Sequence, residues 1–137
     1  MLYQLLKDGY GEQQDFNCAE KILYGANEAY RLGLSKDALK MAAGFGGGMA
    51  TENVCGALTA SIMVLGRMFV RNNAHEGAKI KELTQELLRT YAEAMGEIDC
   101  APLKARYRTE QIKCRDVILK AAEILDAIVA RETAGQT

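Results

Sequence analysis

The chain has 137 residues, with 17 Lys and Arg against 18 Asp and Glu, and a formal net charge of −1. This length suits one domain with a sizeable core, so we expect a single helical domain over residues 1–137. A nearly neutral chain gives no reason to expect nucleic acid or an anionic membrane as a partner. The N-terminus lacks the pattern of a secretory signal peptide, and we therefore expect a cytoplasmic protein.

Helical periodicity dominates the sequence, without convincing strand alternation, which favours an all-α fold. Asn17 with Glu20, and Asn73 with Glu76, have the spacing of capping boxes, and Ser35 is a further candidate N-cap. In chain order, helices are predicted over about 2–7, 18–33, 36–43, 54–70, 74–95, 102–108 and 109–131, followed by a frayed tail over 132–137.

Residues 54–70 are apolar nearly all round, between the polar residues Asn53 and Arg67. A helix that is apolar on every side is a buried one. The stretch is shorter than the roughly 20 residues of a membrane span, and small and polar residues interrupt it. We therefore predict a single compact helical bundle around a buried central helix at about 54–70, capped by Thr51 or Asn53.

A glycine-rich loop precedes this helix. Its glycines leave the backbone free to adopt positive φ and to approach another group closely. A phosphate-binding loop is not favoured, because no strand precedes the loop and no G-K-[ST] follows it. We interpret the loop as a tight turn or as one side of a cofactor site, with these candidate cofactor contacts: Gly46, Gly47, Gly48 and Met49.

Four cysteines carry the candidate chemistry, and none forms a C-x-x-C pair. Cys18, Cys55 and Cys100 are predicted near helix N-termini, where the helix dipole favours a thiolate. Cys114 is predicted one to two turns into the last helix. In a cytosolic protein, such cysteines are more often metal-binding or redox-active than part of a structural disulfide framework.

The segment 104–115 is strongly basic and contains a single acid, Glu110. Basic surroundings lower the pKa of a thiol and also neutralise an anionic cluster held by thiolates. His75 is the only histidine of the chain, so a zinc site with two histidines is excluded.

The segment VCGALTA, residues 54–60, resembles the C-G-A-x-x-G motif of the C_GCAxxG_C_C family of redox-active proteins. Asn17–Glu20 resembles the segment of the family's first cysteine, and Cys100 and Cys114 fall where its later two belong. Ala60 stands in place of the motif's last glycine. The resemblance covers nearly the whole chain and implies a helical domain with a redox role. Related domains occur in cytochrome-containing proteins that can hold iron–sulfur centres, but this chain has no haem-attachment motif.

Three functions remain open, in this order. The first is a redox or electron-transfer protein that binds an iron–sulfur cluster, or another metal such as zinc, through four converging thiolates: Cys18, Cys55, Cys100 and Cys114. The second is a metal-free thiol–disulfide protein with Cys55 or Cys18 as the attacking thiol. The third is a helical interaction module whose cysteines only pack. The sequence does not identify the redox partner.

Association is a separate expectation. Tyr91, Tyr107 and Met68 are predicted to be partly exposed on the long helices. Because most soluble homo-oligomers are two-fold dimers, we expect a homodimer built on helix faces.

Overall fold

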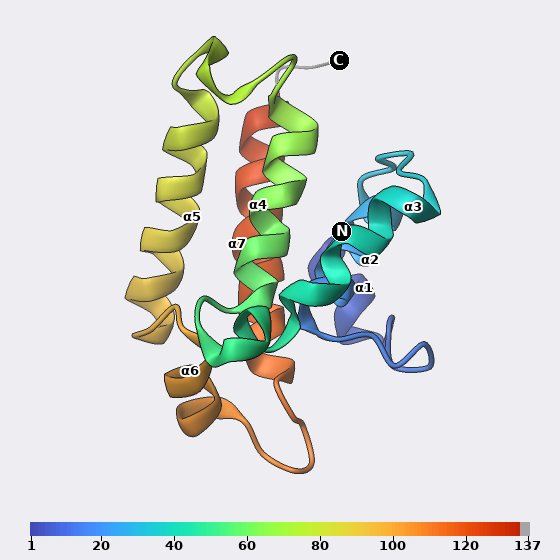
Figure 1. Ribbon diagram of the computed structural model, residues 1–137, viewed down its shortest axis with the longest axis vertical. Helices are drawn as coiled ribbons and strands as arrows, with labels where there is room; N and C mark the ends of the chain where they lie inside the picture. The colour runs from blue at the N-terminus through green and yellow to red at the C-terminus, as the bar shows by residue number, and fades with distance from the viewer. Residues whose placement is uncertain (135–137) are drawn as a thin grey trace.

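The computed structural model describes residues 1–134 and is all-α, as predicted (Figure 1). Over these residues it contains no strand, only two isolated β-bridges. The elements are α1 (Leu2–Lys7), α2 (Cys18–Ala29), α3 (Lys36–Leu39), η1 (Lys40–Phe45), the wide turn η2 (Gly48–Glu52), α4 (Gly56–Phe69), η3 (Ala74–Glu76), α5 (Lys79–Met95), α6 (Cys100–Tyr107) and α7 (Arg115–Thr133).

Helix α4 is the central element. It packs against α2, α5 and α7, and Figure 1 shows it running beside α7 with α5 on one flank and α1–α3 on the other. Leu58, Val64 and Leu65 of α4 are completely buried. The predicted central helix is therefore confirmed, although Ile62 and Met63 on its remaining side are only half-buried.

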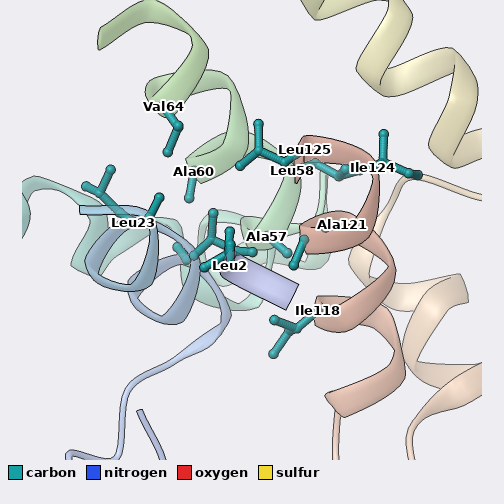
Figure 2. Close-up of a cluster of buried hydrophobic side chains, with 14 of the residues drawn as sticks. Leu2, Leu23, Ala57, Leu58, Ala60, Val64, Ile118, Ala121, Ile124 and Leu125 are labelled. Atoms are coloured by element: carbon teal, nitrogen blue, oxygen red, sulfur yellow. The ribbon is translucent and has the colours of Figure 1, made fainter. Parts of the chain in front are cut away.

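The main core lies where α1, α2, α4 and α7 meet (Figure 2). Helix α1 reaches this core because Gly25 of α2 has no side chain: a Cβ there would lie 2.8 Å from Leu2 Cδ1. The carboxylate of Asp126, on α7, accepts hydrogen bonds from the backbone N–H groups of Leu2 (3.0 Å) and Tyr3 (2.8 Å). One half-buried carboxylate thus holds the start of α1 against α7.

Local capping signals are largely confirmed. The capping box of Asn17 and Glu20 starts α2, and Ser35 caps α3. The box of Asn73 and Glu76 is also formed, but it starts the short η3 instead of α5. Gly96 ends α5 with φ 86°.

Several boundaries differ from the prediction. Cys55, and neither Thr51 nor Asn53, is the N-cap of α4. The last helix begins at Arg115 instead of residue 109 and extends to Thr133. The predicted tail therefore starts too early, and its part beyond residue 134 lies outside the described residues.

One predicted exposure is also corrected. Tyr91 is completely buried, and its hydroxyl donates to the Val117 carbonyl oxygen at 3.0 Å, which joins α5 to α7. Among the residues that the structure describes, no helix has both the length and the apolar composition to cross a membrane.

The centrality of α4 predicts a contrast between two neighbouring aliphatic residues. Leu65→Ala should lower the free energy of unfolding by about 2–5 kcal/mol, because it leaves a cavity at a completely buried position. Ile62→Ala, at a half-buried position of the same helix, should cost clearly less. Urea denaturation followed by circular dichroism measures both, and equal losses would contradict this packing.

Candidate functional site

All four cysteines line one cavity of about 210 Å³ at the end of the bundle where α4 begins. Cys18 and Cys114 are half-buried, whereas Cys55 and Cys100 are only 4% and 7% exposed. The cavity is enclosed by elements from across the chain, and the described residues that line it are Phe16, Asn17, Cys18, Lys21, Gly47, Cys55, Cys100, Leu103, Lys104, Arg108, Lys113, Cys114, Val117 and Ile118.

Each cysteine lies at the N-terminus of a helix. Cys18 and Cys100 are the first residues of α2 and α6. Cys55 and Cys114 are the N-cap residues of α4 and α7. The prediction that Cys114 lies inside a helix is therefore wrong. Four helix N-termini converge on the cavity, and their unpaired N–H groups favour negative charge there.

Cys55 and Cys100 are held together by their backbones. The N–H of Cys55 donates to the Ile98 carbonyl oxygen at 2.9 Å, and the N–H of Cys100 donates to the Asn53 carbonyl oxygen at 2.6 Å. Between these two bonds, Val54 and Asp99 form an isolated antiparallel bridge. This short pairing brings the starts of α4 and α6 to one side of the cavity.

The glycine-rich loop forms a left-handed turn beside Cys18. Gly47, Gly48, Met49 and Ala50 have φ of 65°, 62°, 61° and 60°. Glycine adopts this conformation without steric cost, while other L-residues pay roughly 1–2 kcal/mol each. The turn places the N–H of Gly47 where it lowers the pKa of the Cys18 thiol.

The loop approaches its neighbours closely. A Cβ on Gly48 would lie 2.8 Å from the Cys100 Cβ, and a Cβ on Gly46 would overlap the Asn17 side chain. Of the four predicted cofactor contacts, only Gly47 lines the cavity. Gly46 and Gly48 lie behind it, and Met49 is 40% exposed.

Gly56 brings the first two cysteines together. A Cβ at this position would lie 2.6 Å from the Phe45 carbonyl oxygen and 2.7 Å from the Cys18 sulfur. Both distances are shorter than a van der Waals contact, so only glycine fits without movement of its neighbours. The residue after Cys55 thus allows Cys18 to reach it.

The pair has one acidic and one protonated thiol. A hydrogen bond donated by the Cys55 thiol, supported by the N–H groups of Gly47 and Ala19, lowers the pKa of Cys18 to about 6, against the opposing effect of burial. The same hydrogen bond, together with burial and the negative charge of Cys18, raises the pKa of Cys55 far above its ordinary value. At neutral pH, Cys18 is therefore a thiolate and Cys55 a thiol.

The other two thiols differ from this pair. Burial raises the pKa of Cys100, although the nearby Lys104 ammonium opposes the effect. Cys114 lies beside a guanidinium, with Arg108 Nη1 at 3.7 Å from its sulfur.

Positive charge surrounds the thiols. Lys21, Lys104, Arg108 and Lys113 line the cavity, and among residues 1–134 no Asp or Glu does so. Lys21 is paired with Glu12 at 2.7 Å. The other three cations belong to the segment 104–113. The basic segment that the sequence indicated therefore forms one wall of the site.

The donor set has the chemistry of a metal–thiolate centre, because four thiols face one cavity whose surroundings favour negative charge. The donors are not gathered, however: within residues 1–134, no three His, Cys, Asp or Glu side chains lie close enough together to hold one metal ion. Cys18 and Cys55 interact directly, since each shifts the pKa of the other through a hydrogen bond.

The fold and site define a small helical protein with four thiols around a basic cavity. Residues 16–128 match the protein family described as "Putative redox-active protein (C_GCAxxG_C_C)". The chain therefore belongs to this family, and the resemblance seen in its motifs is confirmed. An uncharacterized protein of Archaeoglobus fulgidus is 26% identical, over 79% of this chain and 81% of the relative. No solved structure matches.

Sequence reasoning missed two features of the site. It did not assign Gly56 to the contact with Cys18, although a glycine directly after a cysteine was a visible signal of close approach. It also placed Cys114 inside a helix. In the structure, Lys113 has a φ of 52°, which ends the preceding turn, and a lysine gives no sequence signal for this glycine-like conformation.

The role of Gly56 predicts opposite effects of one substitution at two positions of α4. Gly56→Ala should destabilise the protein by about 1–3 kcal/mol, because the added methyl group overlaps backbone and sulfur atoms. Gly66→Ala should stabilise it by about 0.5–1 kcal/mol, since a Cβ there meets nothing within 4 Å and alanine favours a helix. Thermal or urea unfolding measures both, and a neutral Gly56→Ala would refute the contact.

Proposed function

We propose that this chain is a thiol–disulfide redox protein in which Cys18 is the attacking thiol and Cys55 the resolving thiol. The observation that carries the proposal is the hydrogen bond from the Cys55 thiol to the Cys18 sulfur. It supports the exchange in two ways, because it makes the two thiols neighbours in one cavity and assigns them different protonation states. Family membership supports the redox class.

Cys18 has the properties of an attacking thiol. The thiolate is the nucleophile in disulfide exchange, and attack is fastest when the pKa lies near the ambient pH. The lowered pKa of Cys18 meets this condition at neutral pH. Its sulfur is half-buried and lines the cavity, so a substrate has access to it.

The exchange proceeds in two displacements. The Cys18 thiolate attacks one sulfur of a substrate disulfide, which forms a mixed disulfide and releases the other substrate sulfur as a thiolate. Cys55 then loses its proton to solvent and attacks the Cys18 sulfur, which forms the Cys18–Cys55 disulfide and releases the second substrate thiolate. Two electrons pass from the protein to the substrate, and a dithiol reductant restores the pair.

The first displacement activates the second. While Cys18 is a thiolate, its charge and hydrogen bond keep the proton on Cys55. Formation of the mixed disulfide removes that charge, and the N–H groups of Ala57 and Leu58, which lower the pKa of Cys55, then act without this opposition. The resolving thiol therefore becomes nucleophilic only after the attacking thiol has reacted.

A metal–thiolate centre is the second candidate. It is favoured by a different observation, that Cys100 and Cys114 face the same cavity as the exchanging pair. All four cysteines would then hold the centre, and an iron–sulfur centre fits this donor set best because no histidine lines the cavity. When bound, such a centre supplies one-electron transfer, and the helix N-termini and basic wall offset the negative charge of its thiolates.

The thiol–disulfide proposal is tested by the pH dependence of alkylation, with the modified residue identified by mass spectrometry. In the metal-free protein, Cys18 should react with a midpoint at about pH 6, whereas an ordinary cysteine has a pKa of about 8.5. Cys55→Ala should move this midpoint upward, because it removes the largest cause of the lowered pKa. Cys55→Ser, which keeps a hydroxyl donor, should retain more of the shift.

An unchanged midpoint in Cys55→Ala would refute the hydrogen-bonded pair. As an independent check, mild oxidation of the reduced protein should yield a Cys18–Cys55 disulfide before any other, as shown by peptide mapping. A first disulfide between Cys100 and Cys114 would reject the assignment of roles.

The two candidates separate when the protein is purified without oxygen. A cluster protein should be brown, contain iron and sulfide, and lose both in Cys55→Ser. A thiol–disulfide protein should be colourless, with four titratable thiols after reduction, as the four free cysteines indicate. Stoichiometric iron and sulfide would make the metal centre the preferred function.

A further inference from the structure

We propose that Lys104, Arg108 and Lys113 form a binding site for the carboxylate of a small anionic disulfide, the substrate class of the redox pair. We call these three residues the basic mouth. The inference rests on the proposed thiol–disulfide function, and it adds which disulfides the site selects. It is carried by the position of the basic mouth, its free charge and the size of the cavity.

The basic mouth lies between the thiols and solvent. Its three residues line the four-cysteine cavity. They also line a second hollow of about 350 Å³, together with Thr109 and Glu110. Because the two hollows share all three cations, a molecule that enters through the outer hollow passes them on its way to the sulfurs.

The charge of the basic mouth is available to a ligand. Among the described residues, no ion pair involves Lys104, Arg108 or Lys113, and their one side-chain hydrogen bond there joins Arg108 to the Cys114 thiol. Glu110 is the one acid lining either hollow in that part of the chain. Lys21, the remaining cation of the cavity, already has Glu12 as its partner. An entering carboxylate would therefore find three cations against a single carboxylate.

Lys104 lies in α6 and Arg108 caps its C-terminus, whereas Lys113 ends a turn that is closed by its own hydrogen bonds. The N–H of Lys113 donates to the Thr109 carbonyl oxygen at 2.8 Å, and the N–H of Ile112 donates to the Thr109 hydroxyl at 3.1 Å. Arg108 adds a planar guanidinium, which can bind a carboxylate through two parallel hydrogen bonds. The positive groups are thus placed by the backbone before a ligand arrives, which lowers the entropic cost of binding.

The dimensions favour a small molecule over a protein substrate. Cys55 is 4% exposed, and the Cys18 sulfur is reached through a cavity of about 210 Å³. A disulfide embedded in the surface of a folded protein would have to displace the walls of this cavity. A low-molecular-mass disulfide with a carboxylate on each arm can place one arm at the basic mouth and its sulfur at Cys18.

The test compares iodoacetate with iodoacetamide, which have the same leaving group but differ by one negative charge. The ratio of their alkylation rates at Cys18 cancels changes in the pKa of the thiol, because both reagents meet the same thiolate. At low ionic strength, this ratio should exceed that of free cysteine by about fivefold for each cation that the anion meets. Salt at about 1 M should abolish the excess, since charges are then screened within a few ångströms.

Charge variants locate the effect. Lys104→Gln and Lys113→Gln should each lower the iodoacetate-to-iodoacetamide ratio toward that of free cysteine. Lys81→Gln removes the same charge from the exposed face of α5, away from both hollows, and should leave the ratio unchanged. A wild-type ratio equal to that of free cysteine, or an equal response of all three variants, would overturn the basic mouth.

Three aliphatic disulfides connect this site to the redox reaction: dithiodipropionate is anionic, hydroxyethyl disulfide neutral and cystamine cationic. The reduced protein should react fastest with the anionic disulfide and slowest with the cationic one. Lys104→Gln should reduce the difference between these rates. Reaction with all three at equal rates would overturn the inference while leaving the redox function intact. No reaction with any of them, combined with a high alkylation ratio, would instead reject the redox function and retain the anion site.

Discussion

The structure depends on the close approach of Cys18 and Cys55, which come from the starts of two helices. That approach requires the absence of a side chain at Gly56, where a Cβ would lie 2.7 Å from the Cys18 sulfur. The left-handed turn at Gly47 places a backbone N–H where it lowers the pKa of the same thiol. The pKa of Cys18 is thus lowered first by the hydrogen bond from the Cys55 thiol and then by backbone N–H groups, against the opposing effect of burial.

The rest of the fold holds this contact in place. Helix α4 is fixed by burial of Leu58 and Leu65 between its neighbours, so the N-terminus with Cys55 has a defined position. The antiparallel bridge between Val54 and Asp99 ties that N-terminus to α6 and thereby brings Cys100 to the cavity. The packing of the helices along the bundle thus fixes the positions of the helix starts that form the site at one end of the bundle (Figure 1).

The sequence predicted the features that depend on local chemistry. The capping box of Asn17, the N-cap at Ser35 and the αL glycine at Gly96 are each encoded within a few residues, and all three are formed. The N-cap of α4 was missed because it depends on a hydrogen bond from the Cys55 N–H to the distant Ile98 carbonyl oxygen, and on a second one from the Cys100 N–H to the Asn53 carbonyl oxygen. The start of α7 was missed because Lys113 adopts a conformation that its residue type disfavours. Local signals predict elements, whereas long-range pairing decides where they begin.

The contrast between local signals and long-range contacts also applies to the site, and it explains why one cysteine differs from the others. Helix N-termini are common to all four thiols, so the helix dipole that the sequence indicated cannot distinguish them. Cys18 differs because the Cys55 thiol donates a hydrogen bond to it, and this bond lowers its pKa. No such bond acts on Cys100, whose pKa is raised by burial. The cations of the basic mouth then act mainly on what enters the cavity. Acidity and selectivity are consequently supplied by different parts of the chain, the glycine loop and the turn before α7.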